Sequence, residues 1–386
     1  MTVVTSGEVV DLISDLVAID SVTPWLVEGG AGEAGIVEFV RSWLEGLPIE
    51  IDVHVIEPGR FNVVATLRGS GGGASLCVNA HADTVGYAGW PETALTARLE
   101  GDRLYGLGAA DDKAGCAIGL CVLRHFATVG PRLRGDLVVA LVADEEGISI
   151  GSEHLVARLR TDMCVVIEPD GLPRVVVEHQ GFGWIDVVAY GRAAHGSVPD
   201  EGVDAIVGLS QIVSHLHRLD QSAYAATSTS RNGRTVFHTG TIRGGTDYAT
   251  YPSEATLGIE IGTQPNETLD DRVKEITDII ATVGEGLPGL SAEVVVRVER
   301  EPFRANGHEM LLAALRRGVR RHLGKELDEA GLNAWTDAAL MQSAGIATVM
   351  MGPLGGNLHC PNEWVSVAEA VSTVDILVEA IEELLS

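Results

Sequence analysis

The most constraining feature of this sequence is an alternation between short apolar runs and helical patterns. The apolar runs, which predict strands, lie at residues 62–67, 75–80, 137–142 and 163–167. The helical patterns, in which apolar residues recur three and four apart, lie at 8–19, 34–47 and 114–126. Strands that alternate with helices predict an α/β domain built on a largely parallel or mixed sheet.

This alternation is interrupted near Glu178 and resumes near Phe303. The interrupting segment predicts strands at 184–190, 235–242, 255–261 and 292–298, and helices at 203–219 and 269–283. Four strands and two helices in that order suit a small α+β domain. We therefore predict a larger domain in two parts, residues 1–178 and 302–386, interrupted by an inserted domain at residues 179–301. A chain of 386 residues is also longer than one compact core usually accommodates.

The composition excludes some partners. Acidic residues outnumber basic ones by 54 to 27, which gives a formal charge of −27. Such a surface repels the phosphates of nucleic acids and anionic membranes, so we expect neither as a partner. Residues 1–14 lack the pattern of a signal peptide, and no apolar segment approaches the roughly 20 residues of a membrane helix. The five scattered cysteines are typical of reduced thiols, so we expect a cytoplasmic protein.

Acidic and histidine side chains gather where predicted strands end. Strand 75–80 leads into His81 and Asp83, strand 137–142 leads into residues 144–146, and strand 163–167 leads into Glu168. Asp111 and Asp112 precede the helix at 114–126, and His359 lies in a late glycine-containing loop. Ligands of open α/β sheets collect at the carboxyl ends of the strands. We therefore expect these side chains to lie close together.

Each of these residues has an ordinary structural explanation when it is taken alone. A histidine after a strand is more often structural, and an aspartate before a helix can simply be its N-cap. Crowded carboxylates, however, are expensive to bury unless cations neutralise them. Asp111, Glu146 and Glu168, with neutral His81 and His359, carry three negative charges; two divalent ions and one hydroxide make the site neutral. Nitrogen and oxygen ligands without thiolate suit zinc, with cobalt or manganese as alternatives.

Seven segments together resemble the di-metal, zinc-dependent family of acetylornithine deacetylase, succinyl-diaminopimelate desuccinylase, aminoacylase and glutamate carboxypeptidase. They lie in one order over essentially the whole chain, at residues 79–85, 106–113, 144–147, 167–169, 193–199, 336–338 and 359–365. The resemblance implies a zinc-peptidase-like catalytic domain with a central mixed sheet. A smaller α+β domain of four strands and two helices, acting as a lid or in dimerisation, would interrupt it.

The resemblance also implies which residues hold the two metal ions. His81, Asp111 and Glu168 would hold one ion; Asp111, Glu146 and His359 would hold the other, with Asp111 bridging the two. The family often has a cis peptide just after the bridging carboxylate, which we expect between Asp111 and Asp112.

Catalytic roles follow from the same resemblance. Glu145 would be the general base that takes a proton from a metal-activated water and returns it to the leaving nitrogen. Asp83 would orient the His81 ring through its other nitrogen. His195 of the inserted domain would reach the oxyanion, often from the partner subunit, so a homodimer through this domain is expected. Asp337 and Glu363 are interpreted as residues that orient ligands or fix loops.

Two positions depart from the family's pattern. Gly262 stands where relatives carry an arginine that meets a substrate carboxylate, and Ala249 stands where they tend to carry asparagine. Arg243 or Tyr248 could substitute for them. Both departures weaken the case for a standard carboxylate-bearing substrate and leave room for an unusual amide.

The leading function is removal of an acyl group from an N-acyl amino acid or a related amine, so that a small amide or short peptide is the substrate. A dipeptidase or carboxypeptidase is the alternative within the class. A non-catalytic binding protein on the same fold predicts damaged ligands or base, but all are intact in this sequence. A nucleotide site at Gly106 and Gly108 lacks the third glycine and precedes two acidic residues.

Overall fold

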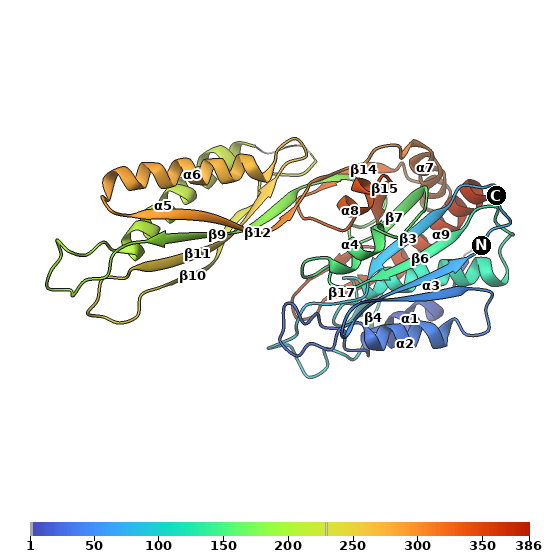
Figure 1. Cartoon of the computed structure of the whole chain (residues 1–386). Helices are drawn as coiled ribbons and strands as arrows, with labels where there is room; N and C mark the ends of the chain where they lie inside the picture. The colour runs from blue at the N-terminus through green and yellow to red at the C-terminus, as the bar shows by residue number, and fades with distance from the viewer. Residues whose placement is uncertain (1–2, 228, 230) are drawn as a thin grey trace. The chain divides into compact units, whose positions relative to one another are not determined.

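The computed structural model describes residues 3–227, 229 and 231–386, which fold into two compact units (Figure 1). The first unit comprises Met1–Val177, Ala305–Ala330 and Thr336–Ser386, and the second comprises Glu178–Arg304 and Gly331–Trp335. The last of these segments lies within the stretch that the sequence analysis placed in the larger domain. It joins the second unit through a hydrogen bond from Gln180 N to Leu332 O (3.3 Å) and through ring contact between Trp335 and Phe182.

The largest sheet among the described residues has nine strands and is mixed, as predicted. Its order is β1-β2-β6-β3-β7-β15-β8-β13, and β14 pairs with β8. Neighbours among β6, β3, β7 and β15 are parallel, whereas β2 runs antiparallel to both β1 and β6. The strands are β1 (Glu50–Glu57), β2 (Arg60–Leu67), β3 (Leu76–His81), β6 (Leu137–Val142), β7 (Met163–Ile167), β8 (Arg174–His179), β13 (Phe303–Arg304), β14 (Asp328–Leu332) and β15 (Ala347–Met351).

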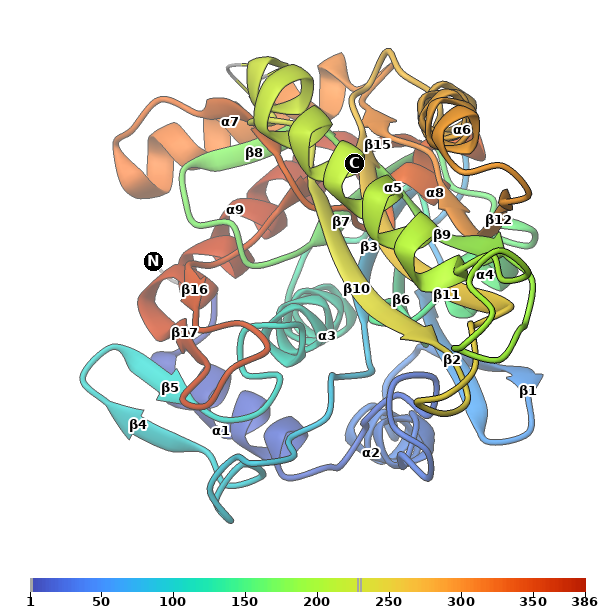
Figure 2. The ribbon, with the colours of Figure 1, turned by 90° about the vertical axis from the view of Figure 1, so that its left-hand side faces the viewer.

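Helices of the first unit cover this sheet (Figure 2). Helix α3 contacts β3 and β6 and packs against α1 and α9, while α4 contacts β6 and α8. The helices are α1 (Ser6–Val17), α2 (Ala34–Trp43), α3 (Lys113–Thr128), α4 (Ile150–Val156), α7 (Glu309–Leu323), α8 (Ala338–Ser343) and α9 (Val367–Leu385). A second, small sheet has the order β16-β17-β5-β4 and consists of β4 (Arg98–Glu100), β5 (Arg103–Tyr105), β16 (Gly355–Gly356) and β17 (Trp364–Ser366).

Burial on both faces explains why strands β6 and β7 are apolar throughout. Every residue of β3 is buried too, although Asn79 and His81 in it are polar. Strand β1 lies at the sheet edge and alternates exposed and half-buried residues around Ile51 and Val53. The sequence analysis did not predict β1, because charged residues interrupt its apolar positions. Period-two alternation is nevertheless a signal for a strand.

The second unit is a four-stranded antiparallel sheet with two long helices, which is the predicted α+β architecture. The strand order is β10-β11-β9-β12, and α5 and α6 pack against each other. The strands are β9 (Gly181–Tyr190), β10 (Phe237–Gly244), β11 (Glu254–Thr263) and β12 (Ser291–Arg300); the helices are α5 (Ala205–Leu219), a π-helical turn η1 (Asp220–Tyr224) and α6 (Leu269–Gly286). Strand β11 alternates buried Leu257, Ile259 and Ile261 with half-buried residues, so one face of the sheet makes the core of this unit.

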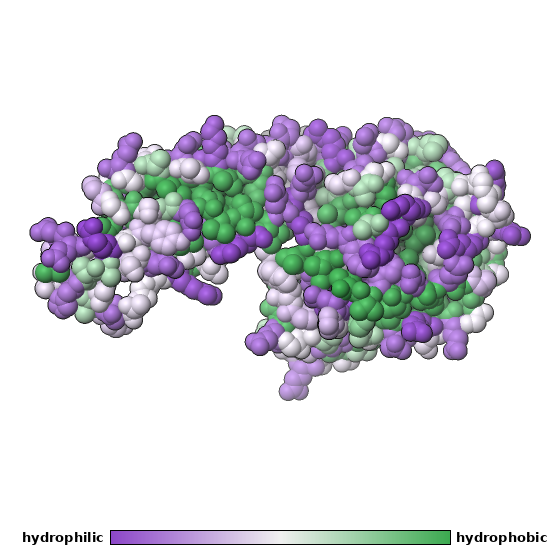
Figure 3. Space-filling view, viewed as in Figure 1, coloured by the Kyte–Doolittle hydropathy of each residue, from purple (hydrophilic) through white to green (hydrophobic). Residues whose placement is uncertain are grey.

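The surface in the view of Figure 3 is largely hydrophilic, with apolar patches on each unit separated by polar side chains. In the part of the chain that the structure describes, no helix is both long enough and apolar enough to cross a bilayer.

Candidate metal centre

The parallel strands of the large sheet bring the predicted ligands together at the carboxyl ends of the strands. His81 is the last residue of β3, the segment 144–146 follows β6, and Glu168 follows β7. His359 lies beyond β15 in the loop between β16 and β17, and Asp111 lies just before α3. Because parallel strands end at the same edge, residues far apart in the sequence become neighbours there.

The first group of potential ligands consists of His81, Asp111 and Glu168. One nitrogen or oxygen atom from each lies within 4.8 Å of those of the other two. His81 Nε2 is 2.8 Å from Asp111 Oδ1, and the other ring nitrogen, Nδ1, is 3.1 Å from the Asp83 carbonyl oxygen and 3.7 Å from its carboxylate. The His81 ring is thus held at Nδ1, which leaves Nε2 directed at Asp111.

The second group consists of Asp111, Glu146 and His359, and it satisfies the same distance criterion. His359 Nε2 lies 3.1 Å from Asp111 Oδ2 and 3.0 Å from Glu146 Oε2. The other oxygen of Glu146 is buried and has no hydrogen-bond partner among the residues that the structure describes. The two oxygens of Asp111 therefore face different histidines, the arrangement that a bridging carboxylate requires. The peptide between Asp111 and Asp112 is cis, as expected from the family resemblance.

Glu145 directly precedes Glu146 in the chain and belongs to neither group of potential ligands. Its backbone N–H donates to Asp83 Oδ1 (3.1 Å), and the Glu146 N–H donates to Asp83 Oδ2 (3.3 Å). Asp83 therefore contacts both His81 and the turn that carries Glu145 and Glu146. Its carboxylate connects two of the strand ends of the candidate site.

The charges of the site are strongly unbalanced without cations. Burial raises the pKa of Glu145 and Glu168 well above the usual glutamate value, and it also raises that of Glu146. Burial opposes ionisation of Asp111 too, but hydrogen bonds from His359 and His81 outweigh it and lower its pKa. The same hydrogen bonds to Asp111 and Glu146 raise the pKa of His359 to about 11. Each carboxylate here needs a positive charge beside it, which protons or metal ions can supply.

Glu363 holds the loop that carries Asp111. Its carboxylate accepts hydrogen bonds from the N–H groups of Gly108 (3.1 Å), Ala110 (2.9 Å) and Asp111 (3.0 Å). Burial, followed by the nearby charge of Asp111, raises the pKa of Glu363 to about 7. These contacts agree with the interpretation of Glu363 as a loop-fixing residue. Asp337 accepts a hydrogen bond from Ser152 Oγ (2.6 Å) and is buried in the first unit.

A buried arginine beneath the Glu145 turn was missed by the sequence analysis. Arg60 Nη2 donates to Glu33 Oε1 (2.7 Å), Asp144 Oδ1 (3.0 Å) and Thr23 Oγ1 (3.1 Å), and all four residues are buried. Asp144 has a positive φ of 67° and is followed directly by Glu145. Arg60 and Glu33 belong to no motif, so only their distance in the fold reveals the contact.

The remaining predicted residues lie in the second unit. His195 is exposed, and its Nδ1 lies 2.8 Å from Ser197 Oγ. Ala249 accepts a hydrogen bond from Gly196 N at its carbonyl (2.7 Å), so it lies beside the His195 segment. A Cβ atom on Gly262 would lie 2.5 Å from Gln180 Oε1 and 3.1 Å from Val236 N. Any side chain at position 262 therefore requires Gln180 and its neighbours to move.

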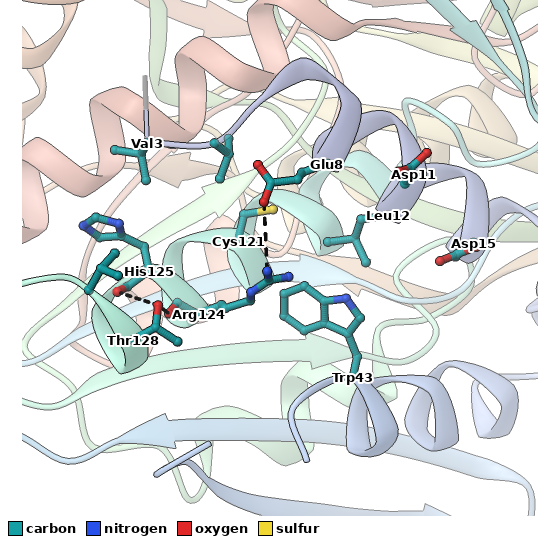
Figure 4. Close-up of a pocket in the computed structure, with 12 residues that line it drawn as sticks. Val3, Glu8, Asp11, Leu12, Asp15, Trp43, Cys121, Arg124, His125 and Thr128 are labelled. Atoms are coloured by element: carbon teal, nitrogen blue, oxygen red, sulfur yellow. Dashed lines mark hydrogen bonds and ion pairs between the residues drawn. The ribbon is translucent and has the colours of Figure 1, made fainter. Parts of the chain in front are cut away.

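A separate pocket lies among α1, the end of α2 and α3, with a cavity volume of about 390 Å³ (Figure 4). The Arg124 guanidinium lies 5.1 Å from the Trp43 ring centre and 3.9 Å from Glu8. Cys121 also lines the pocket, and burial raises the pKa of its thiol to about 12, so it is no thiolate nucleophile. The pocket contains none of the predicted catalytic or metal-binding residues.

Known proteins share this fold and sequence pattern. Residues 77–383 match the sequence profile of peptidase family M20/M25/M40. Acetylornithine deacetylase of Proteus mirabilis (strain HI4320) is 26% identical over 395 residues, covering 97% of this chain and 96% of the relative. A tripeptidase from Staphylococcus aureus subsp. aureus mu50 superposes with a TM-score of 0.81 at 22% identity, covering 99% of both chains. A Bacillus subtilis protein described as a dinuclear metal binding peptidase of this family superposes with a TM-score of 0.73 at 17% identity, covering 98% of both.

The matched region spans most of the chain, so this protein belongs to peptidase family M20/M25/M40. It is a metal-dependent hydrolase of amide or peptide bonds, since the family and its full-length relatives act on such bonds. Small amides or peptides are the corresponding class of substrate.

The buried contact of Arg60 gives a stability prediction. Replacement Arg60→Met leaves the Glu33 and Asp144 carboxylates buried without their cation, and we expect a loss of about 3–5 kcal/mol in the free energy of unfolding. Urea denaturation of the metal-loaded protein measures this loss. The control is Arg68→Met, which removes ion pairs to Glu50 and Asp136 from an arginine that is 60% exposed. We expect the control to cost less than about 1 kcal/mol, and equal losses in the two variants would contradict the argument.

Proposed function

We propose that this protein is a di-metal amidohydrolase that removes an acyl group from an N-acyl amino acid or a related amine. The observation that carries the proposal is the pair of carboxylate–histidine groups that share Asp111, with Glu145 beside them. The similarity to acetylornithine deacetylases over nearly the whole chain favours removal of an acyl group over cleavage of a peptide.

The donor set fits two divalent cations. We propose that His81, Asp111 and Glu168 hold one ion and that Asp111, Glu146 and His359 hold the other. The three carboxylates contribute three negative charges, against the four positive charges of two divalent ions. The unpartnered oxygen of Glu146 is a further position for a cation. Imidazole and carboxylate ligands without thiolate favour zinc, with cobalt or manganese able to replace it.

Glu145 would move the proton that the reaction requires. When bound, the two metal ions lower the pKa of water and polarise the amide carbonyl. Glu145 would accept the proton of the attacking water on its carboxylate and pass it to the leaving nitrogen as the C–N bond breaks. Asp83 would keep this carboxylate in place through the N–H groups of Glu145 and Glu146.

His195 would complete the site from a partner subunit. We propose a homodimer formed through the second unit, in which the exposed His195 ring donates to the developing oxyanion. The contact of Nδ1 with Ser197 leaves Nε2 as the nitrogen for that role. The free cysteines of the chain suit a reducing compartment, so we place the enzyme in the cytoplasm.

A dipeptidase or carboxypeptidase activity is the second candidate. The specific observation in its favour is the fold shared with the Staphylococcus aureus tripeptidase. The two activities differ in whether the recognised part of the substrate lies on the acyl or the amine side of the bond.

Replacement Glu145→Gln tests the proton-transfer role. Glutamine keeps the shape of glutamate but accepts no proton, so we expect turnover to fall at least about a hundredfold. Metal analysis of the same sample should still find two ions per chain. Glu38→Gln on the exposed face of α2 is the matched control and should keep full activity. Full activity in Glu145→Gln would refute the assignment.

Mixing two inactive variants tests whether His195 acts across a dimer. A Glu145→Gln chain still supplies His195, and a His195→Ala chain still supplies Glu145. If the histidine acts on the partner's site, subunit exchange between the two variants creates one intact site per heterodimer and restores activity. If each variant stays inactive after exchange confirmed by mass spectrometry, the cross-subunit role is wrong.

Metal analysis paired with a substrate panel tests the proposed activity. We expect about two metal ions per chain and hydrolysis of N-acyl amino acids that chelation abolishes and zinc restores. Dipeptides in the same panel compare the two candidate activities directly. Faster hydrolysis of dipeptides than of every N-acyl amino acid would replace the first candidate with the second.

A further inference from the structure

An exposed apolar segment borders the candidate metal centre. Trp25, Leu26 and Val27 are consecutive and are 46%, 43% and 40% exposed, although all three are large hydrophobic residues. We call these three residues the Trp25 shelf. They lie in a turn whose backbone closes with hydrogen bonds from Leu26 N and Val27 N to Thr23 O (3.2 Å each).

The shelf is attached to both segments that supply the catalytic carboxylates. Thr23 N donates to Thr84 O (3.0 Å), next to Asp83, and Thr23 Oγ1 donates to Asp144 Oδ1 (2.7 Å), next to Glu145. Gly147 directly follows Glu146. A Cβ atom added to Gly147 would lie 3.1 Å from the Cβ of Trp25, so the two residues are in close contact. The shelf therefore continues the surface of the Glu145 turn.

A second apolar pair lies on either side of β16, in the segment that leads to His359. Leu354 is 43% exposed and Leu358 is 37% exposed. The Leu354 side chain is 3.2 Å from the position of a Cβ on Gly171, in the loop that follows Glu168. Exposed apolar side chains thus adjoin both the Glu145 turn and the Glu168 loop.

This distribution is uneven within the first unit. Of the nine large hydrophobic residues that are exposed there among the described residues, five belong to these two loops. The other four are scattered, at Val55, Leu99, Val129 and Met310. Solvent-exposed apolar residues are ordinary when single, whereas a group beside a reactive site indicates a binding surface.

The charge of the two loops indicates what this surface binds. Residues 23–30 and 353–358 contain one charged side chain, Glu28, and no lysine or arginine. These loops therefore offer no cation for a substrate carboxylate. Gly262, where relatives carry an arginine, offers none either.

We propose that the substrate carries a large apolar group, an aliphatic chain or an aromatic ring, next to the scissile amide, and that the Trp25 shelf with Leu354 and Leu358 binds it. This inference rests on the proposed amide hydrolysis and adds the class of substrate. It predicts that small acyl groups such as acetyl, and charged ones such as succinyl, are poor substrates.

A series of N-acyl amino acids tests the inference, with acetyl, succinyl, octanoyl and benzoyl groups on one amino acid. Dipeptides that contain leucine place the apolar group on the amine side of the bond instead. The zinc-loaded wild type should have the highest kcat/KM for a compound with a large apolar group. Trp25→Ala should lower the octanoyl-to-acetyl ratio of kcat/KM at least about tenfold, mainly through KM. Val129→Ala, at an exposed apolar position at the end of α3, is the matched control and should leave the ratio unchanged.

Leu26→Arg provides a second variant that does not remove the tryptophan. The added cation should raise succinyl hydrolysis relative to octanoyl hydrolysis, because it supplies the missing partner for a carboxylate. An unchanged substrate ratio in both variants would overturn the inference, as would a wild type that prefers acetyl. A changed sedimentation coefficient with unchanged ratios would overturn it too, since it would make the shelf a contact between chains. No hydrolysis of any amide by the metal-loaded wild type would instead refute the proposed function itself.

Discussion

The structure of the candidate site depends on one carboxylate that lies between two histidines. Asp111 Oδ1 faces His81 and Asp111 Oδ2 faces His359, while Glu146 and Glu168 complete the two groups. So many buried carboxylates repel one another, and the cost is tolerable only where positive charge is supplied. The two-metal proposal explains this crowding, because two divalent ions nearly balance the charge of the three carboxylates.

Much of the surrounding chain holds this arrangement in place. Glu363 fixes the loop before α3 by accepting three backbone hydrogen bonds, and Asp83 fixes the Glu145 turn by accepting two. Arg60 donates hydrogen bonds to Asp144, which precedes Glu145, and to Glu33. A network of buried polar groups is costly when it is incomplete, so each contact both positions the site and depends on its partners. The Trp25 shelf is attached to the same network through Thr23, whose hydroxyl donates to Asp144 beside the Glu145 turn.

Most of the fold was predictable because central strands leave a clear pattern. Strands β6 and β7 match the predicted apolar runs residue for residue, and the four strands and two long helices of the second unit were all anticipated. The edge strands and the short helices were not predicted. Strands β1, β4 and β5 are partly exposed, and α4 and α8 are short, so their sequences carry weaker periodic signals. The segment Gly331–Trp335 joins the second unit by contacts that no local pattern shows.

The sequence by itself identified the family and the histidine and carboxylate side chains that follow the predicted strands. Metal-type side chains at strand ends stand out locally, and seven ordered segments identify the family. Only the tertiary structure decided how these residues meet: which oxygen of Asp111 faces which histidine, that Gln180 and Val236 crowd Gly262, and which apolar residues border the site. The physical reason is that hydrogen bonds and burial depend on distances between segments, whereas a sequence records only the order of residues along the chain.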